Sequence, residues 1–300
     1  MQGDYFNVKF KLPHIDPTED GGAFAPPFPC QYTNDPATVR KWIDQFVYNS
    51  EGCYFVGFDT ESVPNAPWMT ERGLKPGPAT VQLSTTESSL VVHLTHCYDK
   101  FPDALGELLY DDEIVKVGVG IDDDLLDLYR HFGPKAESRC RFDIGGIGSP
   151  DGKMMISLKR LTMSVAGIDL PKSKKTARSN WARFPLTKKQ LCYSARDAWA
   201  AAIVLQNLSG KRPDIFGDEA LLSLVVGSER SMHEIDIRAK KRKEAKVSFK
   251  QLLYKIKKLH TIELNEETQK ELDDLEALMR LLRPDGMFVF DPIDLNIHKM

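Results

Sequence analysis

Long hydrophobic runs, an excess of charge of one sign and paired cysteines are all missing from this 300-residue sequence. Its net charge is −3 at pH 7, so the chain as a whole creates no field that would attract a nucleic acid or a membrane surface. Any polyanionic partner must therefore be met by local basic patches. The length is sufficient for one large domain with a smaller appendage.

The cysteines are few and far apart in the sequence. They are Cys30, Cys53, Cys97, Cys140 and Cys192. An odd number without a CxxC pair argues against a disulfide framework and against a zinc site, and is typical of a reducing compartment. The first twenty residues carry acids and no hydrophobic signal segment, and no stretch approaches the roughly 18 apolar residues that span a bilayer. We therefore expect a protein of the nucleus or the cytoplasm.

The order of strand and helix patterns predicts an α/β fold. Apolar runs typical of buried strands occur at 30–33, 54–62, 79–85, 89–95, 115–120 and 141–144. Helical periodicity occurs at 39–48, 103–110, 122–132, 157–167 and 186–208. Strands dominate the first part and helices the second, with alternation between them, which indicates a sheet layered with helices.

Three regions follow from the composition. Residues 1–28 are rich in Pro, Gly and Asp and are expected to form an irregular arm. Residues 29–209 hold all the predicted strands and form the main domain. The sequence from Gly210 to Pro213 breaks the helical pattern, and residues 210–300 beyond it contain helical patterns only.

Two acids lie two residues apart in the predicted strand at 54–62. Asp59 and Glu61 therefore point to the same face of the strand. Burying such acids is costly unless a cation neutralises them, and hard cations such as Mg²⁺ prefer carboxylate oxygens. These residues alone are equally consistent with a strand end whose acids face water.

A tyrosine and a third acid lie four residues apart on the helix predicted at 186–208. Tyr193 and Asp197 therefore share one face, whose other members, Ala200, Ala201 and Val204, are apolar. An acid on a face that packs into the core needs a partner. A metal ion and a buried arginine are both consistent with the spacing.

Three consecutive acids, Asp122, Asp123 and Asp124, follow the strand pattern VGVG and open a helix. The glycines allow a close approach of backbone or ligand. Helix capping and the helix dipole explain one or two acids in a first turn. A remaining acid at the end of the sheet is available for metal, and spacing does not distinguish among the three.

Together these motifs resemble a known family. FDTE, VGVGIDDD and the YxxxD pair of Tyr193 and Asp197 resemble the DEDDy group of the RNase D-type 3′-5′ exonuclease superfamily. The segment RSNWARFPLTKKQLCYSARDA is similar to the exonuclease domain of the Werner-syndrome helicase and its stand-alone relatives. The resemblance covers roughly residues 28–208. It implies an RNase H-like (DnaQ-like) mixed sheet flanked by helices, followed by a smaller helical C-terminal region.

The resemblance also implies a 3′-5′ exonuclease that hydrolyses phosphodiester bonds at the 3′ end of single-stranded RNA or DNA. The expected ligands of two divalent ions, Mg²⁺ or Mn²⁺, are Asp59, Glu61, Asp124 and Asp197. In the family the third acid directly precedes apolar helix residues, here Leu125 and Leu126, which selects Asp124 from the three acids.

The expected mechanism uses two metals roughly 3.5–4 Å apart, which clamp the entering and leaving oxygens of the phosphodiester. We expect Asp59 to bridge both ions. Glu61 and Asp197 are expected to complete the site of the attacking water, and Asp124 to help hold the second ion. Tyr193 is expected to orient that water by hydrogen bonding.

A basic loop precedes the helix that carries Tyr193. Residues 171–189 contain seven basic residues and no acid, so the loop can border the same site and contact phosphates. We expect Lys172 and Arg178 to make these contacts, and Thr60 and Trp181 to take part in substrate binding, with Trp181 serving more to brace the loop than to stack on a base. The alternative is a solvated lysine-rich loop.

A second basic stretch at 238–258 contains ten basic residues and one acid. It is consistent with a nucleic-acid arm, a nuclear-import signal or a polar helix face. Leucines at helical spacing predict packing on the acidic, leucine-rich segment that follows, or on a protein partner or second copy. A competing overall interpretation is a nuclease-fold RNA-binding or adaptor protein, but the full set of acids with Tyr193 favours the enzyme.

Overall fold

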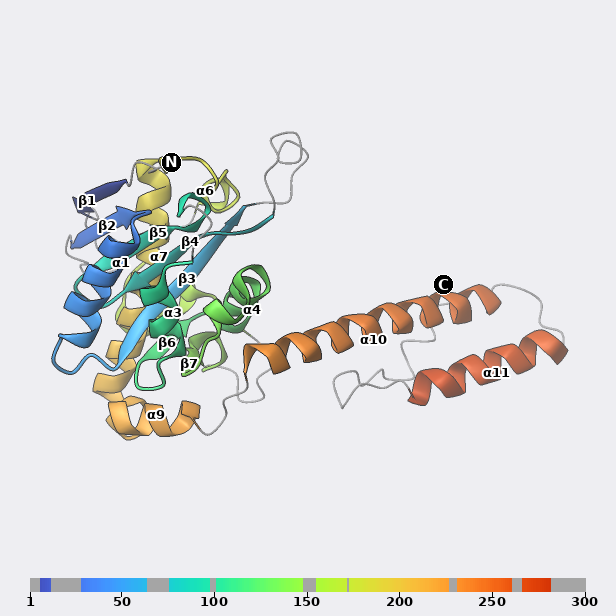
Figure 1. Ribbon diagram of the computed structural model, residues 1–300. Helices are drawn as coiled ribbons and strands as arrows, with labels where there is room; N and C mark the ends of the chain where they lie inside the picture. Colours follow the sequence, from blue (N-terminus) through green and yellow to red (C-terminus); the bar gives the residue numbers. More distant parts are fainter. Residues whose placement is uncertain are drawn as a thin grey trace. The chain divides into compact units, whose positions relative to one another are not determined.

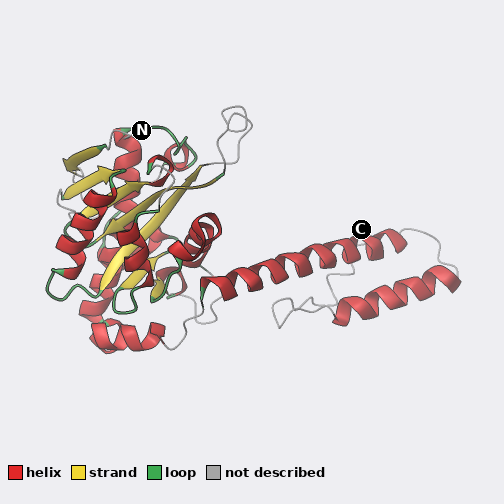
Figure 2. Ribbon diagram, viewed as in Figure 1, coloured by secondary structure: helices red, strands yellow, loops and turns green. Residues whose placement is uncertain are grey.

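The computed structural model describes residues 6–11, 28–63, 76–97, 101–147, 155–171, 173–226, 231–260 and 266–281 (Figures 1 and 2). The chain divides into two compact units, Met1–His233 and Glu234–Met300. The sequence predicts that the main domain ends at residue 209, whereas the first compact unit continues to His233. Lys172 lies outside the described residues.

The first unit is built on one mixed sheet. Its strands are β1 (Asn7–Lys11), β2 (Pro29–Thr33), β3 (Phe55–Val63), β4 (Gly77–Ser84), β5 (Ser89–His93), β6 (Val115–Gly118) and β7 (Arg141–Asp143). Their order in the sheet is β1-β2-β5-β4-β3-β6-β7. β3 pairs antiparallel with β4 and parallel with β6, so the strand that carries FDTES lies inside the sheet and not at an edge.

The described helices follow the predicted order. They are α1 (Pro36–Ile43), α3 (Asp103–Tyr110), α4 (Ile121–Phe132), α5 (Leu158–Leu161), α6 (Lys174–Ala177), α7 (Lys188–Lys211), α8 (Pro213–Phe216), α9 (Asp218–Val226), α10 (Met232–Leu259) and α11 (Glu266–Leu281). Local sequence explains where the main helices start. Asp35 caps α1 by accepting hydrogen bonds from the amides of Ala37 and Thr38. Thr187 and Gln190 form a capping box at the start of α7.

Part of the arm that we expected to be irregular is a strand. β1 pairs antiparallel with β2, and Asn34 continues the contact by accepting a hydrogen bond from the Phe6 amide. Val8 and Phe10 alternate with polar residues, which is the pattern of a strand with one covered face. Pro and Gly nearby in the sequence had masked this pattern.

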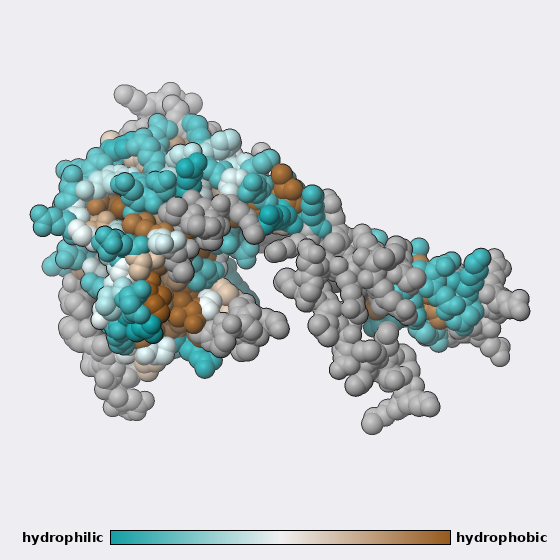
Figure 3. Space-filling view, turned by 90° about the horizontal axis from the view of Figure 1, so that it is seen from below, coloured by the Kyte–Doolittle hydropathy of each residue, from teal (hydrophilic) through white to brown (hydrophobic). Residues whose placement is uncertain are grey.

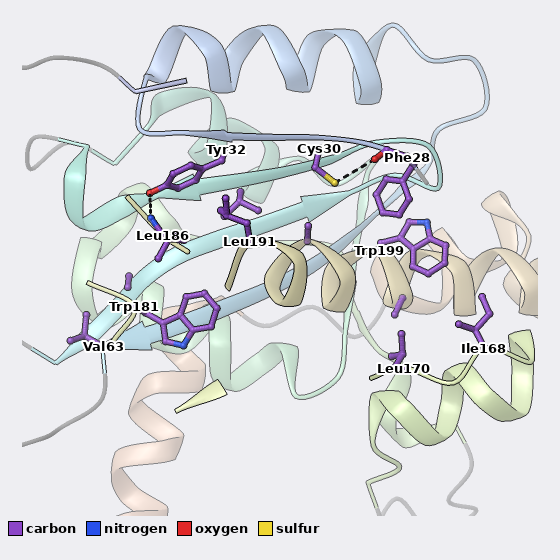
Figure 4. Packing of buried hydrophobic residues seen from close by; sticks show 14 residues of the cluster. Phe28, Cys30, Tyr32, Val63, Ile168, Leu170, Trp181, Leu186, Leu191 and Trp199 are labelled. Carbon is purple, nitrogen blue, oxygen red and sulfur yellow. Dashed lines mark hydrogen bonds between the residues drawn. The ribbon is translucent and has the colours of Figure 1, made fainter. Parts of the chain in front are cut away.

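Helices cover the sheet on both sides. β4 and β5 are buried along almost their whole length, as expected for strands with two covered faces. Figure 1 shows α7 behind the sheet and α1 and α3 in front of it. The cluster between α7 and the strands includes Tyr32, Trp181 and Trp199 (Figure 4).

Helix and sheet approach each other closely at Gly57 in β3. A Cβ atom built on Gly57 would lie 2.0 Å from the backbone oxygen of Ala198 in α7. Only glycine therefore allows α7 to rest directly on the backbone of β3 at this point. Asp59 is two residues further along β3 and Asp197 precedes Ala198, so this contact sets the positions of both acids.

Within the described residues the second unit contains helices only. Ile256 of α10 packs on Leu272 and Leu275 of α11, and His260 lies 3.6 Å from the Glu276 carboxylate. The basic stretch 238–258 lies in α10 and packs on the chain's own acidic helix through this small cluster. The expectation of a protein partner or a second copy stays a prediction.

The described surface carries scattered hydrophobic side chains. On the face shown in Figure 3, hydrophilic residues predominate and hydrophobic ones gather in small areas. None of the helices in the described part of the chain is both long and apolar enough to cross a membrane.

Candidate active site

The two acids of β3 lie on the face that meets α7. Gly57, Asp59 and Glu61 alternate with Phe58 and Thr60 along the strand, and Gly57 touches α7. Burial raises the pKa of Asp59 well above its ordinary value, and neighbouring carboxylates raise it further. Burial, together with other acids nearby, raises the pKa of Glu61 to about 9.

Among the three consecutive acids, the structure brings Asp124 to the site. Thr60 Oγ1 donates a 2.7 Å hydrogen bond to Asp124 Oδ1. Asp122 instead forms an ion pair with Arg141, whose Nε donates a 2.7 Å hydrogen bond to Asp122 Oδ1. Asp123 is exposed. Burial raises the pKa of Asp124 to about 7, although the Thr60 hydrogen bond lowers it. The geometry therefore favours Asp124, which spacing alone could not distinguish.

Helix α7 contributes the tyrosine and the fourth acid. Tyr193 donates its side-chain hydrogen bond to Asp197, as their separation of four residues allows. Burial is the main cause that raises the pKa of Tyr193, and Asp197, Glu61 and Asp59 raise it further. The phenol therefore stays protonated and acts as a hydrogen-bond donor.

The four carboxylates influence one another's ionisation across three elements. Asp124, Asp197 and Glu61 each raise the pKa of Asp59. Within the described residues, Asp59, Glu61 and Asp124 form no ion pair with a basic side chain. Buried carboxylates without such a counter-charge are costly when ionised.

The donor chemistry of this group fits divalent metal ions, since all four side chains offer hard carboxylate oxygens. In the described part of the chain, no three His, Cys, Asp or Glu side chains are gathered closely enough to hold a metal as they stand. Bringing the carboxylates closer increases their mutual repulsion, which a bound cation offsets. The residues therefore have the ligand type and the burial expected of a site for Mg²⁺ or Mn²⁺. Their side chains lie further apart than the ligands of a bound ion would.

Sequence reasoning gave no role to Asp143, which ends β7. Its carboxylate accepts hydrogen bonds from the amides of Gly120 (3.0 Å) and Gly145 (2.8 Å), and it contributes to the raised pKa of Asp124. It fixes the turn from β6 into α4. In the sequence, Asp143 lies at the carboxyl end of the predicted strand 141–144, and this position could have indicated a role near the site.

The residues predicted to bind substrate differ in their exposure and in their contacts. The Thr60 hydroxyl is engaged with Asp124. Arg178 is exposed at the end of α6. Trp181 has no exposed surface and donates from Nε1 to the Ala177 carbonyl, so it braces the loop and has no free face for a base. Lys172 lies outside the described residues.

Known proteins resemble both the sequence and the fold. A family model described as 3′-5′ exonuclease matches residues 32–211. The bifunctional 3′-5′ exonuclease/ATP-dependent helicase WRN of Mus musculus is 35% identical over 153 residues, which are 51% of this chain and 11% of that protein. A 3′-5′ exonuclease of Arabidopsis thaliana is 32% identical over 157 residues, 51% of this chain and 52% of that protein. The matched regions thus span about half, or much less, of these relatives' own lengths.

Among solved structures, the catalytic core of RRP6 from Trypanosoma brucei superposes with a TM-score of 0.51 at 15% identity, covering 72% of this chain and 54% of that chain. This likeness bears on the fold alone and confirms the RNase H-like mixed sheet flanked by helices. The family model runs from β2 to the end of α7 and includes the three elements that carry the acids. The chain therefore belongs to the 3′-5′ exonuclease family.

Proposed function

We propose that this chain removes nucleotides from the 3′ end of single-stranded nucleic acid by hydrolysing phosphodiester bonds. The observation that carries the proposal is that carboxylates from β3, α4 and α7 lie near enough for three of them to raise the pKa of the fourth, Asp59, beside a tyrosine that donates to Asp197. Family membership supports the direction of cleavage.

The carboxylates of Asp59, Glu61, Asp124 and Asp197 would hold two divalent ions, Mg²⁺ or Mn²⁺. When bound, such ions supply an activated water and neutralise the charge that develops on the phosphodiester oxygens. Thr60 restrains one oxygen of Asp124 by hydrogen bonding, so this carboxylate is held in one orientation before any ligand arrives.

Tyr193 orients the attacking water through its hydroxyl group. Its raised pKa keeps the proton on the phenol, so it contributes by hydrogen bonding and not as a general base. Its bond to Asp197 restrains the ring, and Trp181 packs near it with ring centroids 6.2 Å apart. Both contacts restrict the rotamers that would move the hydroxyl out of position.

Degradation of end-labelled single strands tests the proposal. With Mg²⁺ or Mn²⁺, a 5′-labelled strand should shorten in single-nucleotide steps, and a 3′-labelled strand should release labelled mononucleotide at once. EDTA should stop both. Release of label from the 5′ end first, or internal cuts, would contradict the direction of attack.

The same assay separates an enzyme from the competing adaptor interpretation and defines the substrate. A protein that binds labelled strands tightly but leaves them intact with either metal would support a binding module. Matched RNA and DNA strands of one sequence should then be compared, because the 2′-hydroxyl is the group that distinguishes them.

A further inference from the structure

A cavity of about 300 Å³ lies between α6 and the first turn of α7. Three cationic side chains, Lys175, Arg183 and Lys189, line it, and hydroxyl and amide side chains complete its wall. All three cations are exposed, so solvent and ligands reach them. This is a different set from Lys172 and Arg178, which the sequence had suggested.

The charge around this cavity is not balanced by the protein. No acidic residue occurs between Asp169 and Asp197. Lys175, Arg183 and Lys189 form no ion pair with an acid in the part of the chain that is described. The first turn of α7 carries lysines and no acid, although the positive end of a helix dipole disfavours cations. A bound anion would reduce the repulsion among these cations and the repulsion between the lysines and the helix dipole.

The wall of the cavity is fixed by Gln190, whose side chain is 3% exposed. Its Oε1 accepts hydrogen bonds from the backbone amide and the hydroxyl of Thr187 at 3.0 and 2.9 Å. Its Nε2 donates to Ser179 Oγ and to the Asn180 carbonyl, both at 3.0 Å. One buried amide thus ties α7 to the loop, so the cavity keeps its shape without a ligand.

A buried histidine holds the back of the same loop. Burial lowers the pKa of His93 to about 3, so its ring is neutral. The ring lies 3.1 Å from the Trp181 carbonyl through Nε2 and 2.6 Å from the Tyr32 hydroxyl through Nδ1. Since a carbonyl only accepts, Nε2 donates to Trp181 and Tyr32 donates to Nδ1. Tyr32 in turn accepts from the Leu186 amide at 3.2 Å (Figure 4).

The cavity lies on the same side of α7 as the catalytic residues. Lys189, Tyr193 and Asp197 follow one another at intervals of four, so they form one stripe along the helix. At 1.5 Å per residue, Lys189 is roughly 12 Å from Asp197 along the helix axis. A strand whose 3′ end lies at the carboxylates can therefore pass this cavity.

We propose that the cavity binds a backbone phosphate of the substrate strand, on the 5′ side of the bond that is cut. This inference rests on the proposed function, since it takes the carboxylates as the site of cleavage. Its prediction is that Lys175, Arg183 and Lys189 set the affinity for long strands and leave the hydrolytic step unaffected.

The test uses two variants of the full chain with the same number of changes. One is Lys175→Ala with Lys189→Ala, and the control is Lys174→Ala with Lys188→Ala, one residue earlier on the same two helices. All four lysines are exposed, so both variants should fold with unchanged Tm. The first double variant is the cavity variant, and Arg183→Ala is added to it only in a separate third variant.

Binding is measured by fluorescence anisotropy in an Asp59→Asn background, which separates binding from cleavage. The cavity variant should bind a long single strand about tenfold more weakly or worse, a loss equal to about 1.4 kcal/mol. Its log–log salt slope should shrink by roughly 0.7 per lost phosphate contact. The control variant should stay close to the parent in both respects.

Steady-state cleavage gives the second readout. In the chain with Asp59 intact, the cavity variant should raise KM for the long strand, with little change in kcat and no change for a dinucleotide that does not reach the cavity. Equal losses in both lysine pairs, or an equal loss with the dinucleotide, would overturn the proposal. If no strand is cleaved, the proposed function fails, while the anisotropy comparison still decides whether the cavity holds a phosphate.

Discussion

Two groups of like charge each include a residue of α7, and they differ in burial. The carboxylates around Asp59 are buried, and their pKa values rise because burial and neighbouring acids disfavour ionisation. The cations around Lys189 are exposed at the start of the helix and repel one another only through solvent. Buried like charge is costly unless protonation or a bound cation neutralises it. Exposed like charge costs little, because solvent screens it, and it can attract a mobile polyanion.

The difference predicts a separation of roles. Changes to the buried acids should act on the rate of hydrolysis, and changes to the exposed cations should act on affinity. Variants of the buried acids, of Tyr193 on α7 and of Gln190 test that separation.

The largest effect is expected from Asp59→Asn. Removing a buried carboxylate whose pKa three other acids raise should lower kcat on the order of 10³-fold, since the site would lose a proposed metal ligand. The raised pKa leaves little charge on this carboxyl without metal, and asparagine has nearly the same shape, so Tm without metal should not fall. Asp123→Asn, an exposed acid of α4, is the control and should keep its activity. Substantial residual cleavage by Asp59→Asn would remove this residue from the mechanism.

Tyr193→Phe should have a smaller effect of the same kind. Without its hydroxyl, the donor to Asp197 is lost, and with it the oxygen that can accept a hydrogen bond from the attacking water. The value of kcat should fall about 10²-fold with little change in KM. Tyr129→Phe, whose hydroxyl lies 3.4 Å from His233, serves as a matched control. A change in KM with an unchanged kcat would mean that Tyr193 contributes to substrate binding and not to the hydrolytic step.

Stability without metal should decrease as the pH rises. Glu61 has a pKa raised from 4.5 to about 9, and Asp124 from 3.8 to about 7. Between the ordinary and raised values the folded chain retains protons that the unfolded chain has released, so a higher pH favours unfolding.

Scanning fluorimetry in EDTA between pH 4.5 and 9 should therefore show a falling Tm over the window of the Glu61 shift. Mn²⁺ should restore more stability at the alkaline end, where the carboxylates are ionised. Glu61→Gln should flatten the curve in EDTA. A Tm that rises through this range would show that the buried acids do not govern the pH dependence.

Gln190→Leu should have the smallest effect on the reaction. It removes the hydrogen bonds that connect α7 with Ser179 and Asn180, at a cost of about 1–3 kcal/mol in the free energy of unfolding. We expect a few-fold weaker binding of long strands and nearly unchanged kcat. Gln206→Leu, on the exposed side of the same helix, is the control. A large loss of kcat would mean that the loop and the carboxylates are not separable.

The sequence allowed most of the sheet to be predicted, because β3, β4 and β5 are apolar runs in a fold that covers both of their faces. The acids of β3 and the Tyr193–Asp197 pair followed from strand and helix periodicity. Selecting Asp124 needed the resemblance, since the contacts that distinguish it, Thr60 to Asp124 and Arg141 to Asp122, join residues far apart in the chain.

The basic loop was recognised by composition, but its geometry was not. A helix of only four residues, α6, directs Lys175 into the cavity and leaves Arg178 outside it. Trp181 is buried because the loop folds back onto His93 and Tyr32. Short helices and long-range hydrogen bonds leave no periodic pattern, so sequence periodicity does not predict them.

The direct contact of α7 with β3 has a consequence for how the chain tolerates mutation. At Gly57 the spacing of helix and strand is set by backbone atoms, since the glycine hydrogen faces the Ala198 carbonyl. A contact made by side chains changes its length when a side chain is substituted or changes rotamer. The contact at Gly57 is made by backbone atoms, so substitutions at other positions do not change its length. Substitutions elsewhere in the core can therefore accumulate and lower stability while the separation between Asp59 and Asp197 stays constant. Hydrolytic rate and thermal stability should drift independently among variants of this chain, except at the glycine itself.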